Sequence, residues 1–177
     1  QSEAFTQPLI ERDIPPARIR YLPNWAEDFY RQGNADAVAD PLAEFKGVRI
    51  LFAGNIGTAQ SVETIIEAAQ LLGHRPDIHW MFVGDGIMRK WLEEQIRLRH
   101  LEATVAQRER LPPEQMPALF AHADALLVTL RRDPVFSITI PSRIQSFLAS
   151  GKSIVGALDG EGARIINEAG AGFVAHA

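Results

Sequence analysis

The fold is decided by one stretch, residues 138–155, which reads ITIPSRIQSFLASGKSIV. The pattern is a loop that ends at Ser142, a short helix, a glycine stop at Gly151 and an apolar strand from Ser153. Such a helix start is where α/β proteins hold anionic ligands. The first backbone N–H groups of a helix lack internal partners, and its dipole adds roughly half a positive charge there. The pattern places Arg143 in the first turn of this helix.

The same alternation of strand and helix runs through the rest of the chain. Apolar strand candidates lie at residues 48–53, 78–83, 104–106, 125–130, 153–157 and 172–175, and the intervening helix candidates at 61–72, 88–98, 113–122 and 162–169. Residues 131–140 are expected to form a loop. Strands that are apolar on both faces and alternate with helices indicate a parallel sheet covered on both sides. We therefore expect an α/β fold, a Rossmann-like doubly wound parallel sheet of about six strands with helices on both faces.

Composition excludes several classes of protein. The 177 residues suffice for one domain of ordinary size, and the net charge of −4 gives no general attraction to nucleic acid or to anionic membranes. The absence of cysteine excludes disulfides, thiolate nucleophiles and cysteine-based metal sites. No apolar run approaches the roughly 18 residues of a membrane span. We expect a cytoplasmic protein without a nucleic-acid partner that binds any anion locally.

Residues 1–46 differ in character from the remainder. They are rich in Pro, Asp, Glu and Arg and show no sustained hydrophobic period. We interpret them as a linker with a remnant of a preceding domain, so that the start of the chain is a cut, and residues 47–177 as the domain proper.

Two glycine-rich segments follow the first two strand candidates. Residues 54–57, GNIG, form either a tight turn or a ligand loop. They do not match the G-x-G-x-x-G fingerprint, and no P-loop lysine follows, which argues against nicotinamide cofactors and against NTPases. Residues 84–86, GDG, either approach a ligand at the end of the second strand or, the interpretation we favour, form a turn in which Asp85 helps cap the next helix.

Charged side chains give one sharper signal. The five histidines show neither metal-ligand nor catalytic-triad spacing, so we expect them to be ordinary surface or boundary residues and expect no metal site. Arg131, Arg132 and Asp133 form either a solvated loop or the approach to a ligand cleft. The position of Arg143 favours a functional role. A cation in the first helical turn is repelled by the positive end of the helix dipole, and a bound anion would relieve this repulsion.

Seven segments, taken together, keep the order and spacing of a known family. They are residues 22–25 (LPNW), 51–57 (LFAGNIG), 63–69, 81–86 (MFVGDG), 123–125, 141–143 (PSR) and 149–152 (ASGK). In this they resemble the donor-binding half of retaining GT-B glycosyltransferases of family four, over roughly residues 19–177. The G-N-I-G-x-x-Q loop and the P-S-[KR] element are similar to bacterial surface-polysaccharide enzymes, including those that transfer N-acetylfucosamine-like sugars from a UDP carrier.

The resemblance implies a site for a nucleotide sugar. In the family, the first glycine-rich loop and the helix after the fourth strand hold the diphosphate, and the loop near the third strand receives the base. By position, the implied donor-binding residues are Gly54, Asn55, Gly57, Gln60, Gln107, Arg108, Pro141, Ser142, Arg143 and Ser146. No metal and no cofactor are implied besides the nucleotide sugar itself.

The chain departs from the family pattern at four positions. Asn55 and Gln60 stand where most members place an arginine and a lysine on the phosphates, so Arg143, together with Arg131 or Arg132, is the candidate to supply the charge. The family's two glutamates fall at Ile138 and Ser146. The second normally accepts hydrogen bonds from the ribose, which a serine does neutrally and with shorter reach.

The resemblance implies transfer of a sugar from a nucleotide-diphosphate carrier, UDP being favoured, in cell-envelope polysaccharide or lipopolysaccharide biosynthesis. The saccharide or lipid-linked acceptor, the catalytic residue and any peripheral attachment to the inner face of the membrane are expected to belong to a missing N-terminal domain, without which the fragment is inactive. Two alternatives stay open: a noncatalytic partner subunit with a degenerate site, and a Rossmann-type nucleotide-dependent oxidoreductase or epimerase.

Overall fold

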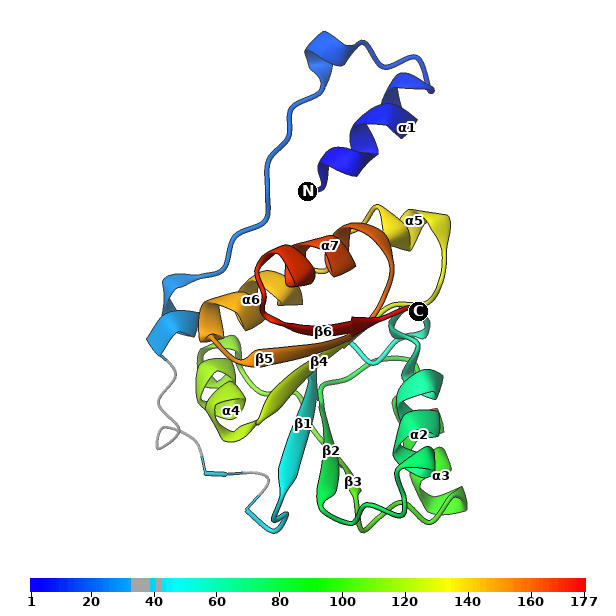
Figure 1. Cartoon of the computed structure of the whole chain (residues 1–177), viewed down its shortest axis with the longest axis vertical. Helices are drawn as coiled ribbons and strands as arrows, with labels where there is room; N and C mark the ends of the chain where they lie inside the picture. Colours follow the sequence, from blue (N-terminus) through cyan, green and yellow to red (C-terminus); the bar gives the residue numbers. More distant parts are fainter. Residues whose placement is uncertain (33–38, 41–42) are drawn as a thin grey trace.

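Six strands form one parallel sheet in a computed structural model that describes residues 1–32, 39–40 and 43–177 (Figure 1). The strands are β1 (Val48–Ala53), β2 (Ile78–Val83), β3 (Val105–Arg108), β4 (Ala125–Thr129), β5 (Ser153–Ala157) and β6 (Gly172–Ala175). Their order across the sheet is β3-β2-β1-β4-β5-β6, and every neighbouring pair is parallel. The predicted Rossmann-like doubly wound sheet is confirmed.

This strand order creates a switch point between β1 and β4. The chain runs outward from β1 through β2 to β3 and then returns to place β4 on the other side of β1. Loops that leave β1 and β4 therefore diverge and open a crevice at the carboxyl ends of these strands. Open α/β sheets bind their ligands at this place.

Alternate residues of each strand pack on opposite faces of the sheet. Leu51 and Met81 belong to one buried cluster, and Phe52 and Phe82 belong to the other. Helices α2 (Val62–Leu71) and α3 (Arg89–Leu98) cover the phenylalanine side, and α4 (Met116–His122), α6 (Arg143–Ser150) and α7 (Gly160–Glu168) contribute to the opposite cluster (Figure 1). Helices thus cover both faces of the sheet, which agrees with strands that are apolar on both sides.

Two local expectations are corrected. The segment expected to be a loop at 131–140 contains α5 (Pro134–Ser137), because the Asp133 carboxylate accepts a hydrogen bond from the Val135 N–H at 2.7 Å and caps it. Asp85 does not cap α3. Its carboxylate accepts from the neighbouring Gly86 N–H instead, and α3 begins after Met88 without a side-chain cap.

The part of the chain before β1 is mostly irregular. Its short helical turns are η1 (Glu3–Phe5), α1 (Thr6–Ile10), η2 (Pro16–Arg18) and η3 (Asp28–Gln32). Helix α1 lies apart from the sheet (Figure 1). Residues 33–38 and 41–42 of the interpreted linker lie outside the described residues, and the interpretation of 1–46 as a linker stays a prediction. No helix in the described ranges is long and apolar enough to cross a membrane.

Segment η3, although it precedes the sheet, is bound to it by aromatic contacts. The Tyr30 ring stacks on Phe120 of α4, with the ring centroids 5.8 Å apart. Phe120 in turn meets the edge of Phe147 of α6, with centroids at 5.3 Å and planes at 87°. Such pairs contribute roughly 0.5–1.5 kcal/mol each beyond area burial. This aromatic ladder holds residues 25–30 over α6.

Candidate functional site

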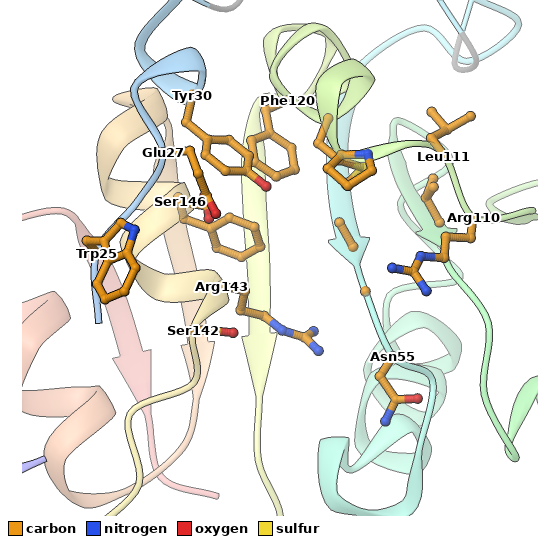
Figure 2. A pocket seen from close by; sticks show the side chains of 16 residues that line it. Trp25, Glu27, Tyr30, Asn55, Arg110, Leu111, Phe120, Ser142, Arg143 and Ser146 are labelled. Atoms are coloured by element: carbon orange, nitrogen blue, oxygen red, sulfur yellow. The ribbon is translucent and has the colours of Figure 1, made fainter. Parts of the chain in front are cut away.

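A cavity of about 430 Å³ opens at the switch point (Figure 2). Six parts of the chain line it: the segment 25–30, the end of β1 at residues 53–55, the last residue of β2, the loop at 110–113 that follows β3, helix α4 and the start of α6. The carboxyl edge of the sheet and the amino end of a helix thus meet in one hollow. This is the place where the fold itself favours an anionic ligand.

The backbone at the end of β1 lies close to the Arg143 side chain. Gly54 has φ +127°, a conformation that L side chains rarely adopt, and a Cβ there would lie 3.1 Å from Nη2 of Arg143. Its N–H donates to the Val83 carbonyl at 2.9 Å, which fixes this strand end against β2. Glycine at position 54 therefore allows the Arg143 guanidinium to lie directly beside the chain.

Arg143 is the first residue of α6, as the sequence predicts. The carbon of its guanidinium lies 4.7 Å from the centre of the Phe52 ring, a cation–π arrangement. Its Nη1 atom is fully enclosed and has no hydrogen-bond partner among the described residues. Burial lowers the pKa of Arg143 to about 10. A buried, charged donor without an acceptor is costly, and a bound anion would satisfy it.

A second guanidinium faces the same cavity. Figure 2 shows the side chains of Arg110 and Arg143 directed into the hollow from different walls, with Asn55 nearby. Arg110 is exposed and forms no ion pair with any described residue. Two unneutralised cations converging on one space indicate a ligand with more than one negative charge.

The remaining polar wall is made by Glu27, Tyr30, Ser142 and Ser146. Among the described residues that line the cavity, Glu27 has the only carboxylate. Apolar side chains fill the gaps, notably Leu111 on the Arg110 side. The cavity therefore combines cationic, hydroxyl and apolar surface.

The structure brings half of the sequence-predicted donor residues into this cavity. Lining it are Gly54, Asn55, Ser142, Arg143 and Ser146; outside the lining are Gly57, Gln60, Gln107, Arg108 and Pro141. The assignment of these ten residues to donor binding stays a prediction.

The five residues outside the lining have varied surroundings. Gln60 accepts a hydrogen bond from the Asn55 amide at 3.2 Å and so braces the loop after β1. Both side-chain polar atoms of Gln107 are enclosed without a described partner. Arg108 is engaged by Glu44, with Nη2 2.8 Å from the carboxylate. Gly57 and Pro141 flank the lining residues in sequence.

The other charged candidates do not reach the cavity. Arg131 pairs with Glu63 at 3.4 Å, and Arg132 lies 3.7 Å from Asp159, so both guanidiniums face carboxylates outside the lining. Near the end of the chain, His176 Nδ1 lies 2.8 Å from Oδ1 of Asp159, and this hydrogen bond lowers the pKa of the Asp159 carboxyl. No group of three His, Asp or Glu side chains converges to hold a metal within the described ranges.

Sequence reasoning missed the contribution of the segment before the sheet. Trp25, Glu27 and Tyr30 all line the cavity, whereas the sequence indicates only a linker with a remnant of a preceding domain at residues 1–46. The available signal was the LPNW segment, which carries the family pattern at 22–25. After β3, the sequence predicts Gln107 and Arg108 as site residues. The residues that line the cavity there are Arg110 and Leu111, a few positions further along the chain.

A doubly wound parallel sheet with a cationic cavity at its switch point defines an open α/β domain, the type that holds its ligands at the carboxyl ends of the strands. The chain belongs to a particular family of this type, the glycosyl transferases group 1, whose model matches residues 38–176. Its fold matches GT-B glycosyltransferase structures.

The chain is similar to two curated glycosyltransferase sequences and to a solved structure, among others. A probable glycosyltransferase, WbjE of Pseudomonas aeruginosa, is 31% identical over 93% of this chain and 42% of its own length. The putative colanic acid biosynthesis glycosyl transferase WcaI of Escherichia coli (strain K12) is 31% identical over 87% of this chain and 38% of its own. The structure of Anabaena Alr3699/HepE in complex with UDP and glucose superposes with a TM-score of 0.75 at 19% identity, over 99% of this chain and 48% of that one. The chain therefore spans about two fifths of the curated relatives it matches.

Proposed function

We propose that residues 47–177 are the nucleotide-sugar-binding domain of a retaining GT-B glycosyltransferase of family four, and that residues 1–46 link it to an acceptor-binding domain. One observation carries the proposal: Arg143 lines the switch-point cavity, and its enclosed Nη1 has no hydrogen-bond partner among the described residues. A diphosphate supplies the acceptor oxygens that this donor lacks.

The diphosphate would lie between three groups of this chain. Arg143 and Arg110 face the cavity as cations, and the backbone at Gly54 leaves room beside them. Negative charge grows on the leaving diphosphate as its bond to the sugar breaks. The Arg143 guanidinium, held against Phe52 and enclosed, would stabilise that charge with little reorganisation, and the proposal assigns no metal to this site.

The similar proteins support a choice of donor and of biological setting. The Anabaena protein holds UDP and glucose on the same fold, which supports a UDP-sugar as donor. The name of the Escherichia coli relative places it in colanic acid biosynthesis, which supports assembly of a cell-surface polysaccharide or lipopolysaccharide by this family member, with N-acetylfucosamine-like sugars as one donor class. The acceptor and the catalytic residue would come from the acceptor domain, so the 177 residues alone should bind donor without transferring it.

The test is titration calorimetry of the 177-residue chain with UDP, GDP and ADP, comparing wild type with Arg143→Met. Methionine keeps the apolar stem of the side chain and removes the charge, and we expect UDP affinity to fall by about tenfold or more. The matched control is Arg132→Met, an exposed arginine outside the lining, which should leave affinity unchanged. Equal UDP affinity in wild type and Arg143→Met would refute the role of Arg143. Failure of all three nucleotides to bind wild type would instead identify a degenerate partner subunit.

A further inference from the structure

The acidic side chain of the cavity needs an explanation. Glu27 is exposed and lines the same hollow as Arg110 and Arg143. It forms no ion pair or side-chain hydrogen bond with a described residue. A carboxylate beside an anion site repels the ligand, unless the ligand also carries hydroxyl groups that donate to it.

The position of Glu27 is fixed by its own turn and by the aromatic ladder. Its backbone carbonyl accepts from the Tyr30 N–H at 3.1 Å, so the two residues belong to one tight turn. Tyr30 stacks on Phe120, which contacts Phe147 of α6. Glu27 is therefore held by the same contacts that dock η3 on α6, although it lies outside the strands and helices of the sheet domain.

Ser146 of α6 lies on the same side of the cavity. Figure 2 shows the Glu27 carboxylate and the Ser146 side chain close to each other in the view, and both line the hollow. Ser146 follows Arg143 by three residues, which places it about 4.5 Å further along the helix axis. A group attached directly to a phosphate at Arg143 would thus lie near Ser146, in the hollow that Glu27 also lines.

We infer that Glu27, together with Ser146, accepts hydrogen bonds from the ribose hydroxyls of the bound nucleotide. This inference rests on the proposed function, because it needs a nucleoside diphosphate at Arg143. A carboxylate accepts from both hydroxyls of a vicinal diol, and charge-assisted bonds of this kind are roughly twice as strong as neutral ones. The segment before the sheet thereby sets the preference of the site for ribonucleotides.

The test compares three probes on the 177-residue chain: UDP, 2′-deoxy-UDP and inorganic pyrophosphate, each by titration calorimetry. Wild type should bind UDP about tenfold more tightly than 2′-deoxy-UDP, since one charge-assisted hydrogen bond is lost. Glu27→Gln keeps the shape, and we expect it to reduce this ratio to about twofold. Pyrophosphate has no ribose, so its affinity should stay the same or rise slightly when the negative charge is removed.

Asp28→Asn is the matched control, because it removes one exposed carboxylate from the adjacent position, outside the lining; it should keep the full UDP preference. Ser146→Ala is the second variant and should lower the ratio by a smaller factor. An unchanged ratio in Glu27→Gln, an equal loss for UDP and 2′-deoxy-UDP, or a wild type without preference would each overturn the inference while leaving nucleotide binding at Arg143 intact. A wild type that binds neither UDP nor pyrophosphate would overturn the proposed function as well.

Discussion

Replacing Arg143 by methionine should stabilise the ligand-free protein even though it damages the site. The guanidinium is held against Phe52, and its Nη1 has no described partner, so the folded state encloses a charge that water solvates in the unfolded chain. Methionine fills a similar volume and carries no charge. The variant therefore removes a penalty from the folded state.

The magnitude follows from the pKa of Arg143. Burial lowers it to about 10, which corresponds to at most about 3 kcal/mol against the charged form in the folded protein. Loss of the cation–π contact with Phe52 offsets about 1 kcal/mol of this. We expect a net gain of about 2 kcal/mol in the free energy of unfolding, or roughly 4–8 °C in Tm for a chain of this size.

The assay is thermal and urea unfolding of wild type, Arg143→Met and Arg132→Met, each with and without UDP. At a UDP concentration about 100 times the wild-type Kd, wild type should gain about 2.7 kcal/mol and Arg143→Met about half as much. The direction in which the stability of wild type changes with pH provides an independent check. Because the folded-state pKa of Arg143 is depressed, the unfolded state binds more protons above pH 10, and wild-type stability rises toward that of the variant there. A variant that is less stable than wild type at neutral pH would refute the reasoning.

Four further variants distinguish residues that stabilise the scaffold from residues that serve the site. Gly84→Ala should destabilise the domain by several kcal/mol in urea unfolding, because its Cβ would lie 1.8 Å from the Gly54 carbonyl oxygen; Gly151→Ala, which has open space, should cost only about 1–2 kcal/mol for its positive φ. Lys152→Met should lose about 1–2 kcal/mol, since the ammonium donates to two carbonyls at the end of α4, and calorimetry should show unchanged UDP affinity. Tyr30→Leu should weaken UDP binding several-fold with little loss of global stability, because it releases segment 25–30 from α4; equal UDP affinity would show that this segment does not serve the site.

Most of the fold could be predicted from the sequence because its signals are local. An apolar strand followed by a helix with one buried face leaves few arrangements, and a parallel sheet is the one that covers both faces. Glycine stops such as Gly151, which has φ +68°, mark the helix ends. The helix α5 escaped prediction because its cap, Asp133, lies in a charged loop that has no periodic pattern. The strand order also needed the structure, since periodicity says nothing about which strands are neighbours.

The site was predictable only where a single element creates it. Arg143 breaks a local rule, a cation in the first turn of a helix, and the sequence shows this violation without any tertiary information. Glu27 and Arg110 break no local rule. They join the cavity through tertiary packing, Glu27 by the stack of Tyr30 on Phe120 and Arg110 by the course of the loop after β3.

Two charged groups that the resemblance implies, but that this chain lacks at the matching positions, are supplied to the cavity by other residues. Asn55 stands where the family resemblance implies an arginine, and Arg110 directs a cation into the same cavity from a different loop. Ser146 stands where the resemblance implies a carboxylate, and Glu27 brings one to the same cavity from the segment before the sheet. A ligand responds to the charge that surrounds it, and the position in the sequence that supplies the charge is immaterial to it. On the functions proposed above, the site keeps both signs of charge that a nucleoside diphosphate requires, and this accounts for a binding cavity in a chain whose motif positions would suggest a degenerate one.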